Sequence, residues 1–376
     1  MLRTFTKVQT KGQLYVMQEK LDLYTDYLLS SFGQTSATGL SRLVDGAISH
    51  DSVSRLLSGS EFSSKTLWQK VKPLVREHES PEGCLIFDDV IIEKPHTDEN
   101  EMICWHWDHS KKRMVKGANM LNAFYHTQSS EDAEPLRLPV GFELILKTIL
   151  FCDIKSRKEK RKCPVTKNEL MQQMITQAIH NQLKFKYILA DSWFASAANM
   201  RFIKNKKKCF IFDIKTNRKV ALCEEDRNAG HWTRIDEIDI PDNTPVKVWL
   251  KDLEFPLLLT KQVFKNKNQS TGVRFLVSND FSLSDDDFTT LYKKRWSVEE
   301  YHKSLKQNAA IAKSPTRTLR TQSNHIFASI MAYVKLEKLK FSSKMNHFAM
   351  KSKIYLAANK AAFKELSALK AQVASA

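Results

Sequence analysis

The sequence lacks the features that mark secreted, disulfide-linked and membrane-spanning proteins. It holds only six cysteines in 376 residues, and none of them forms a C-x-x-C pair. This usage fits a reducing compartment better than a disulfide scaffold. The first residues contain no apolar segment typical of a signal peptide, and no apolar run approaches the ~20 residues that span a bilayer. We therefore expect a cytoplasmic chain without a membrane-embedded part.

Nucleotide-binding and repeat signatures are absent as well. No G-x-x-x-x-G-K-[ST] motif occurs, so the sequence implies no ATP requirement. Neither an internal repeat nor a low-complexity tract is visible. With 42% hydrophobic and 27% charged residues, the chain is typical of a folded globular protein that is long enough for more than one domain.

Positive charge, in contrast, is abundant. The sequence has 59 Lys and Arg against 42 Asp and Glu, a formal net charge of +17 and a pI of about 9.5. This excess favours a polyanionic partner, with nucleic acid first and an anionic membrane surface second, over a protein that is merely basic. Basic runs recur at 109–117, 155–162 and 204–208, where phosphate contact competes with an ordinary solvated surface.

The N-terminal part of the chain has helical periodicity. Apolar residues recur at helical spacing over 12–32. Two short helical patterns then flank a turn that contains Gly46 and Ser49, with the second helix near 50–57 and Ser49 or Asp51 as its cap. The pattern fits a helix-turn-helix that binds DNA, and it fits an ordinary helical hairpin equally well.

The middle of the chain predicts a mixed α/β core. Residues 84–93, CLIFDDVIIE, form an apolar run rich in β-branched residues, which predicts a buried strand. Further strands are expected at 102–110, 118–127, 139–153, 185–191 and 208–215, with helices over 166–184 and 195–205. Residues 216–280 alternate short strands with polar turns, including HWTRIDEIDI at 231–240, and predict a mostly β insertion. A helix capped by Ser284 follows, and helical patterns continue into a Lys- and Ala-rich tail.

Three acids lie where acids are costly. Asp88 and Asp89 interrupt an apolar strand, and Asp191 ends another, where α/β folds commonly place functional groups. Phosphodiester chemistry with metal ions uses a few carboxylates that hold two Mg²⁺ about 4 Å apart. Because side chains alternate along a strand, only one of Asp88 and Asp89 is expected to serve such a site.

A fourth acid lies in an unusual helical stripe at 292–306, YKKRWSVEEYHKSLK. On one continuous helix, Tyr292, Arg295, Glu299, Lys303 and Lys306 fall within an arc of roughly 80°. One carboxylate among cations suits a metal ligand at a scissile phosphate with bases along the neighbouring phosphates. The periodicity alone also fits a plain amphipathic helix with i,i+4 ion pairs.

The same residues carry a family resemblance. Tyr292, Arg295, Glu299 and Lys306 fit Y-x2-R-x3-E-x6-K without a gap, which resembles the signature of the insertion-sequence-four family of bacterial DDE transposases, relatives of the Tn-five and Tn-ten enzymes. LIFDDVIIEK resembles the family's first-acid strand and YILADSWFAS its second-acid strand. HSKKRMVKGANMLN resembles the basic segment between them. The resemblance covers about residues 40–330.

The resemblance implies a metal-binding catalytic triad of Asp89, Asp191 and Glu299. Asp89 is preferred because the family's acid directly precedes a position that is often Thr, here Val90, and this departure keeps Asp88 as the alternative. The implied cofactor is Mg²⁺ or Mn²⁺, two ions per active site. The fold implied is an RNase H-like α/β core, and the separation of 108 positions between the second and third acids matches relatives with a β insertion there.

The resemblance also implies DNA contacts. Tyr292, Arg295 and Lys306 would hold terminal phosphates, with Lys303 in the same stripe and Lys116 in the basic segment. An aromatic residue of the insertion would stack on a flipped base of a hairpin intermediate. The candidates for this stacking role are Trp249 first, then Trp232 and Phe275, each of which also fits a plain core position.

We therefore predict a cut-and-paste transposase that works as a homodimer on double-stranded DNA, namely the terminal inverted repeats of its element and a target, in the bacterial nucleoid. The predicted parts are an N-terminal helical DNA-binding region (1–80), the core in two segments (81–215 and 281–340), the β insertion (216–280) and a helical tail (341–376). A nuclease without strand transfer and a catalytically idle DNA-binding regulator remain alternatives.

Overall fold

The computed structural model describes residues 11–374 apart from 60, 110, 129–132, 155–156 and 267–268. The chain forms two compact units. One unit comprises residues up to Leu67, Ile92–Ala118 and Tyr301 onward, and the other comprises Trp68–Ile91 and Asn119–Glu300. We call them the terminal unit and the central unit.

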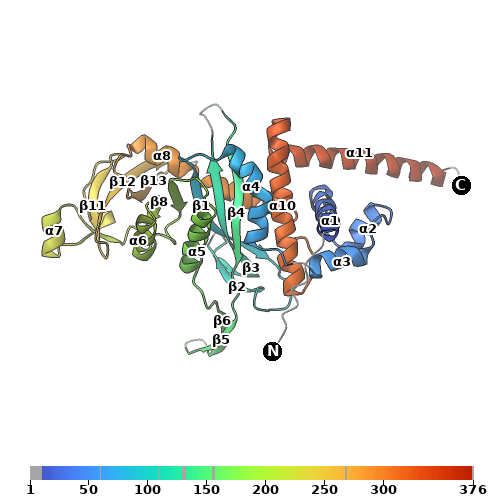
Figure 1. The fold of residues 1–376 in the computed structure, drawn as a ribbon, viewed down its shortest axis with the longest axis horizontal. Coiled ribbons are helices and arrows are strands. Elements are labelled where there is room, and N and C mark those ends of the chain that lie inside the picture. The colour runs from blue at the N-terminus through green and yellow to red at the C-terminus, as the bar shows by residue number, and fades with distance from the viewer. Residues whose placement is uncertain are drawn as a thin grey trace. The chain divides into compact units, whose positions relative to one another are not determined.

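A large mixed sheet confirms the predicted mixed α/β class (Figure 1). Its strands follow the order β10-β9-β11-β12-β13-β8-β7-β1-β3-β2, and β4 pairs with β3. The first strands are β1 (Cys84–Glu93), β2 (Cys104–Asp108), β3 (Arg113–Thr127), β4 (Leu136–Leu144), β7 (Tyr187–Ala190) and β8 (Cys209–Ile214). The later ones are β9 (Lys219–Ala221), β10 (Thr233–Arg234), β11 (Val246–Leu250), β12 (Pro256–Lys265) and β13 (Thr271–Ser278).

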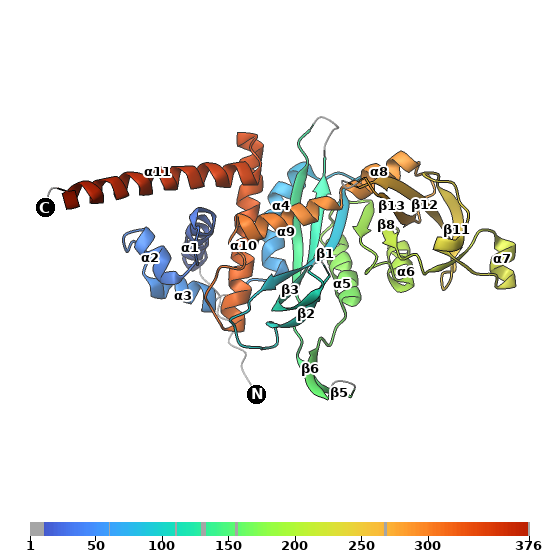
Figure 2. The same ribbon diagram turned by 180° about the vertical axis from the view of Figure 1, so that it is seen from behind.

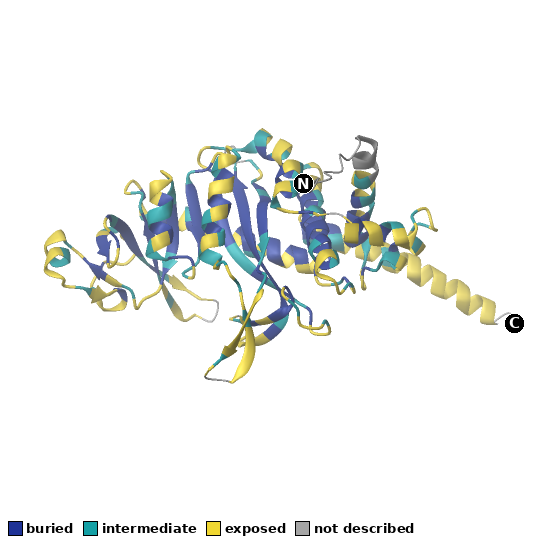
Figure 3. Ribbon diagram, turned by 60° about the horizontal axis from the view of Figure 1, so that its bottom comes forward, coloured by how far each residue is buried: buried dark blue, intermediate teal, exposed yellow. Residues whose placement is uncertain are grey.

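Three parallel strands, β1, β7 and β8, form the core of the central unit. Most of their residues are buried and none is exposed, as the dark ribbon in Figure 3 shows. This burial on both faces explains why the strands read as continuous apolar runs rather than alternating ones. Helices α5 (Lys167–His180) and α6 (Ala197–Asn205) pack beside them, with α5 against β4 and α6 against β8.

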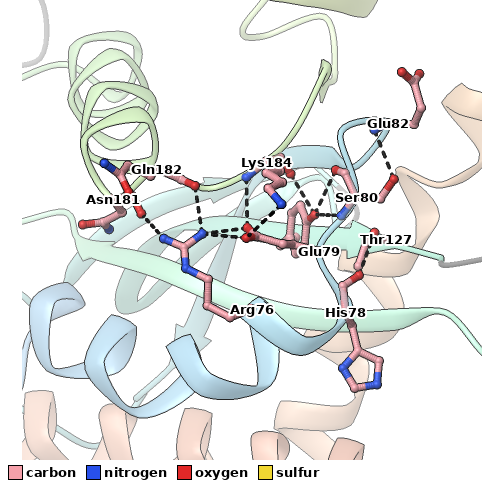
Figure 4. A network of polar contacts seen from close by, with 10 residues as sticks. Arg76, His78, Glu79, Ser80, Glu82, Thr127, Asn181, Gln182 and Lys184 are labelled. Carbon is pink, nitrogen blue, oxygen red and sulfur yellow. Dashed lines mark hydrogen bonds and ion pairs between the residues drawn. The ribbon is translucent and has the colours of Figure 1, made fainter.

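A polar network fixes the beginning of β1 beside the beginning of β7 (Figure 4). Arg76, near the end of α4 (Ser64–His78), donates to the carbonyl oxygens of Asn181 at 2.6 Å and Gln182 at 2.8 Å. The guanidinium also pairs at 2.8 Å with Glu79, whose buried carboxylate accepts the Lys184 N–H at 3.1 Å. A buried carboxylate needs such partners, so this network sets where the two strands start relative to each other.

The helices of the terminal unit include those predicted near the N-terminus. They are α1 (Lys11–Ser30), α2 (Ala37–Leu43), α3 (His50–Gly59), α10 (Leu319–Ser343) and α11 (His347–Ala374). Two short helices do flank the turn at Gly46, and Ser49 caps the second, because its Oγ accepts the Ser52 N–H at 3.2 Å. Asn324 of α10 donates to the Leu57 carbonyl of α3 at 2.6 Å. In this unit α3 therefore has a packing partner in α10.

Several predicted boundaries are wrong. The single strand expected over 139–153 is two strands, because β4 ends at Leu144 and β5 (Ile149–Asp153) pairs with β6 (Lys158–Lys162) in a separate two-stranded sheet. The region 216–280 is mostly β but also contains α7 (Glu224–Ala229), whose first turn carries acids and whose end has Gly230 in the left-handed region. The strand expected at 231–240 shrinks to β10 and a 3₁₀ turn, η1 (Ile235–Glu237).

The helical stripe is also broken. The chain forms α8 (Asp285–Lys293) and α9 (Trp296–Gln307) rather than one helix, so Tyr292 and Glu299 lie on different helices and Arg295 lies between them (Figure 2). The predicted cap is confirmed, since Ser284 and Asp287 form a capping box at the start of α8. Within the described residues, no helix is long and apolar enough to cross a lipid bilayer.

Candidate active site

Strand register brings acids together at one end of β1 and β7. The two strands are parallel and their last paired residues are Phe87 and Ala190, so Asp88 and Asp191 follow at the same level on neighbouring strands. Neighbouring strands lie about 4.8 Å apart, which is close enough for strong repulsion between two carboxylates. Burial and then repulsion from Asp89 and Asp191 raise the pKa of Asp88 to about 7.

Asp89 has a different set of neighbours. Its two oxygens accept from Lys167 Nζ at 2.8 and 2.9 Å, and one also accepts from Asn119 Nδ2 at 2.8 Å. The backbone N–H of Asp89 donates to Asp88 Oδ1 at 3.0 Å. Both side chains of the Asp89–Lys167 pair are largely shielded from solvent, at 20% and 24% exposed. Asp89 is therefore held by a cation and an amide that come from outside its own strand.

Asp191 lies in the turn that follows β7. Its Oδ1 accepts the backbone N–H of Trp193 at 3.0 Å. Burial raises the pKa of Asp191 and repulsion from Asp89 adds to it, whereas the Trp193 hydrogen bond and the charges of Arg295 and Lys167 act in the opposite direction. Asp191 thus interacts with groups from β1, from α5 and from the segment between α8 and α9.

Glu299 is linked to the aspartates of this site through Arg295. Arg295 Nη2 lies 2.7 Å from Glu299 Oε1, and its side chain is only 12% exposed. Burial lowers the pKa of Arg295, but interactions with Tyr292, Glu299 and Asp88 raise it above its ordinary value. The buried Tyr292 ring lies 5.7 Å from the Arg295 guanidinium carbon, so it packs against the cation rather than facing solvent.

Buried Asn199 ties the loop after Asp191 to the beginning of α5. Its Nδ2 donates at 2.9 Å both to the Phe194 carbonyl and to Asn168 Oδ1, while its Oδ1 accepts from Gln172 at 2.9 Å. Lys167 is the first residue of α5, which Thr166 begins with a capping box. Since an amide so fully engaged holds one orientation, the network sets Lys167 at a fixed place relative to Asp191.

The donor set can be compared with the needs of a divalent cation. Carboxylate oxygens are the ligands that Mg²⁺ prefers, and the repulsion among Asp88, Asp89 and Asp191 is the kind that a cation relieves. Among the residues that the structure describes, however, no three His, Cys, Asp or Glu side chains are arranged to hold one ion. The chemistry of the residues fits a metal, and in this arrangement Lys167 and Arg295 neutralise two of the carboxylates.

The remaining predicted site residues are lysines of the terminal unit and aromatic residues of the central unit. Lys116, Lys303 and Lys306 belong to the terminal unit. Partial burial lowers the pKa of Lys306, and repulsion from Lys111 lowers it further. The predicted stacking residues of the central unit are covered to different degrees. Trp249 is 7% exposed and Phe275 is 5% exposed, both within the sheet, whereas Trp232 is half-buried.

Several polar residues of the site are absent from the sequence-based prediction. Lys167 and Asn119 hold Asp89, and Arg274 stacks 5.0 Å from the Tyr292 ring beside Asp213. Asp213 interrupts the apolar run CFIFDI of β8, the same signal that identified Asp88 and Asp89. Lys167 carries no comparable signal, because a lysine after a helix cap is common on any surface.

The chain was compared with known protein families. Residues 160–335 match the family described as the transposase DDE domain. The matched segment includes Asp191, Arg295 and Glu299 and begins beyond Asp89. No curated protein matches the chain. The family match supports a DDE transposase.

Proposed function

We propose that this chain is a metal-dependent DNA transposase that cleaves the ends of a mobile element and joins them to a target, in the manner of the insertion-sequence-four family. The observation that carries the proposal is the electrostatic coupling of Asp88, Asp89 and Asp191 at the ends of two parallel strands, with Glu299 tied to them by Arg295. Such a concentration of partly buried acids is unfavourable for stability and is typical of a catalytic site.

In this proposal Asp89, Asp191 and Glu299 are the ligands of two Mg²⁺ or Mn²⁺ ions, with Asp88 as the alternative to Asp89. When bound, the ions would neutralise charge on the scissile phosphate and promote attack by water. Arg295 would bind a phosphate next to the scissile one, since its guanidinium is always charged and presents a planar set of donors. The buried Tyr292 would position Arg295 instead of contacting DNA.

The reaction proceeds by phosphoryl transfer. Water attacks the phosphorus at the element's end, the bond to the 3′ oxygen breaks, and the strand is left with a 3′-OH. That hydroxyl next attacks a phosphate of the opposite strand, which closes a hairpin and expels the 3′ oxygen of the flanking DNA. Water then hydrolyses the hairpin bond and restores the 3′-OH. This 3′-OH attacks a phosphate of the target, and a 3′ oxygen of the target strand leaves. For Trp249 to stack on a flipped base, its indole must first turn out of the sheet, because only 7% of it is exposed.

Two cations hold the acids before DNA arrives. Lys167 contacts both oxygens of Asp89, and Arg295 contacts Glu299. Both cations are attracted to phosphate, so an incoming DNA end would draw them from the carboxylates at the moment when the ions bind there. Lys167 and Arg295 would thus exchange one anionic partner for another without leaving the site.

The predicted parts of the chain keep their proposed roles. Residues 81–215 and 281–340 would form an RNase H-like core, which the parallel β1, β7 and β8 support. Strands β9–β13 would form the insertion, and the helices of 1–80 a DNA-binding region. Lys116, Lys303 and Lys306 would contact phosphates, and the helical tail would span 341–376. We further propose a homodimer that brings two element ends together.

A second candidate is a DNA-binding regulator without chemistry. It is favoured by one observation: among the described residues, no three potential ligands surround a metal site, and Asp89 and Glu299 each pair with a cation. In a regulator these ion pairs would be permanent, and divalent cations would leave both the fold and its stability unchanged.

The decisive experiment uses the purified full chain, Mg²⁺ and a labelled duplex that carries the DNA flanking the coding sequence. We expect strand cleavage and, with a second duplex added, a joined product; both should disappear with EDTA. Cleavage without joining would identify a nuclease, and binding without cleavage would identify the regulator. The variants Asp88→Asn and Asp89→Asn decide the first ligand, because only the true ligand's loss should abolish cleavage.

A further inference from the structure

The two-stranded sheet of β5 and β6 is a protruding arm of the central unit. Along the chain it lies between β4 and α5, and Figure 1 shows it extending downward, away from the large sheet. Most of its residues are exposed, as the yellow ribbon at the bottom of Figure 3 shows. An isolated two-stranded hairpin is marginally stable in water. Its conformation therefore needs either internal contacts or a partner, and its surface indicates which partner fits.

The arm carries a marked excess of positive charge. Its described residues, 149–154 and 157–162, include five basic side chains against two acidic ones, a formal excess of three. Such an excess on a narrow ribbon attracts an anionic polymer.

Strand register sorts these charges onto one face. Residues paired across an antiparallel ladder share a face, and β5 and β6 pair Ile149 with Lys162, Phe151 with Lys160 and Asp153 with Lys158. One face therefore presents Lys158, Lys160 and Lys162 in a row. Alternate residues of a strand are about 6.8 Å apart, which equals two nucleotide steps of about 3.4 Å each, measured along the axis of a DNA duplex.

Apolar side chains accompany the lysine row. Phe151 is 38% exposed on the same face, with Lys162 Nζ 5.6 Å from its ring centre. Ile154, where β5 enters the turn, is 91% exposed. Proteins that grip DNA with β-ribbons combine cations with apolar residues that wedge into a groove. Lys160 also pairs with Asp153. Two lysines of the row can therefore contact phosphates directly, and Lys160 becomes the third when DNA displaces Asp153.

The arm is connected directly to the proposed active site. Lys167, whose ammonium contacts Asp89, follows Lys162 by only five positions along the chain. Five residues span at most about 17 Å. A duplex seated on the arm would therefore lie within a short distance of the cation that holds the first acid.

We infer that the β5–β6 arm is a DNA-binding element that contacts the phosphates of a duplex through Lys158, Lys160 and Lys162, with Phe151 and Ile154 against the groove. The inference rests on the proposed function, since it assumes that the chain acts on DNA. It adds a contact surface that is separate from the acids and from the stripe of Tyr292 to Lys306.

The test measures binding of the full chain to a fluorescent duplex of arbitrary sequence, about 30 base pairs long, over roughly 50 to 300 mM KCl. The variant Lys158→Gln/Lys160→Gln/Lys162→Gln should bind at least about tenfold more weakly at low salt. Its slope of log K against log[KCl] should be shallower by about 2 to 3, since each phosphate contact contributes ~0.9. A thermal melt followed by circular dichroism should match that of the unmodified chain.

The matched control is Lys360→Gln/Lys364→Gln/Lys370→Gln on exposed α11, which removes the same charge. Its slope should change by less than about 1. An unchanged slope in the arm variant, or an equal change in the control, would overturn the inference while leaving the proposed function standing. Loss of self-association, or of binding to phosphatidylserine vesicles, with the slope intact would assign the arm to another partner. If the unmodified chain binds no DNA, both proposals are wrong.

Discussion

In the proposed active site, opposite charges and hydrogen-bond donors surround the acids: Lys167 and Asn119 hold Asp89, Arg295 holds Glu299, and the Trp193 N–H holds Asp191. In the β5–β6 arm the side chains are exposed and basic residues outnumber acidic ones. The two regions belong to the same unit and carry the same residue types. Their surroundings differ, and from this difference we expect chemistry at the first region and attraction of DNA at the second.

The largest effect is expected from Asp191→Asn. The change removes a carboxylate but no cation, so cleavage should fall at least about a thousandfold, or ~4 kcal/mol in activation free energy, while duplex affinity is kept. Single-turnover cleavage and anisotropy measure the two quantities. Lys364→Gln on α11 is the control and should cleave at the normal rate. Cleavage retained in Asp191→Asn would remove this residue from the site.

Arg295→Lys should have a smaller effect, a loss of roughly 10- to 100-fold in cleavage rate. Lysine keeps the charge but loses the planar guanidinium that contacts Glu299 and stacks on Tyr292. Cleavage at saturating duplex isolates the rate from the affinity. A rate equal to that of the unmodified chain would show that Arg295 contributes only charge.

Asp88→Asn should stabilise the protein, with an effect that depends on pH. Burial and repulsion from Asp89 and Asp191 raise the pKa of Asp88 to about 7. Between about pH 4 and that value the folded chain binds more protons than the unfolded one, so stability falls as pH rises through this window. The variant lacks this loss, so its free energy of unfolding should exceed that of the unmodified chain by an amount that grows from about pH 5 to about pH 8 and reaches roughly 2 kcal/mol. Thermal melts at each pH measure the difference.

The neighbouring Asp89→Asn provides the contrast for this measurement. It leaves Lys167 without its carboxylate, so it should destabilise the chain. Two melts that shift in the same direction would contradict the different surroundings described for these adjacent acids.

The smallest effect is expected in the arm. Phe151→Ser should change the free energy of unfolding by no more than about 0.5 kcal/mol, because the ring is exposed. The matched change Phe87→Ser in β1, where the ring is fully buried, should cost about 3 to 5 kcal/mol. Denaturant titrations measure both. A large loss at Phe151 would mean that the arm is part of the folded core.

The strands that carry the acids could be predicted because a strand buried on both faces consists of a continuous run of apolar residues. CLIFDDVIIE and YILA are apolar runs that make sense only inside a sheet, and β1 and β7 begin and end close to where these runs do. The cap at Ser284 could be predicted as well, and the structure shows it as a capping box with Asp287. Local chemistry fixes such features, and they survive without knowledge of the partner elements.

Features that depend on distant contacts were missed. The stripe from Tyr292 to Lys306 fits one helix by periodicity, yet the helix is interrupted at Lys294 and Arg295. At this interruption the buried Tyr292 ring packs against the guanidinium groups of Arg274 and Arg295. Lys167 and Asn119 meet Asp89 only through tertiary structure. Strand β6 of the arm was missed because the sequence KEKRK has no apolar periodicity that would indicate a strand.

The interleaving of the two units has a consequence for synthesis on the ribosome. Helices α1 and α3 emerge early, but their partner α10 is translated some 260 residues after α3. Until then Tyr24 lacks His325, to which its hydroxyl bonds at 3.0 Å, and Val53, Leu56 and Leu57 have no α10 to cover them. These apolar faces therefore remain uncovered while the central unit is synthesised, and the nascent chain must avoid aggregation through them during that time.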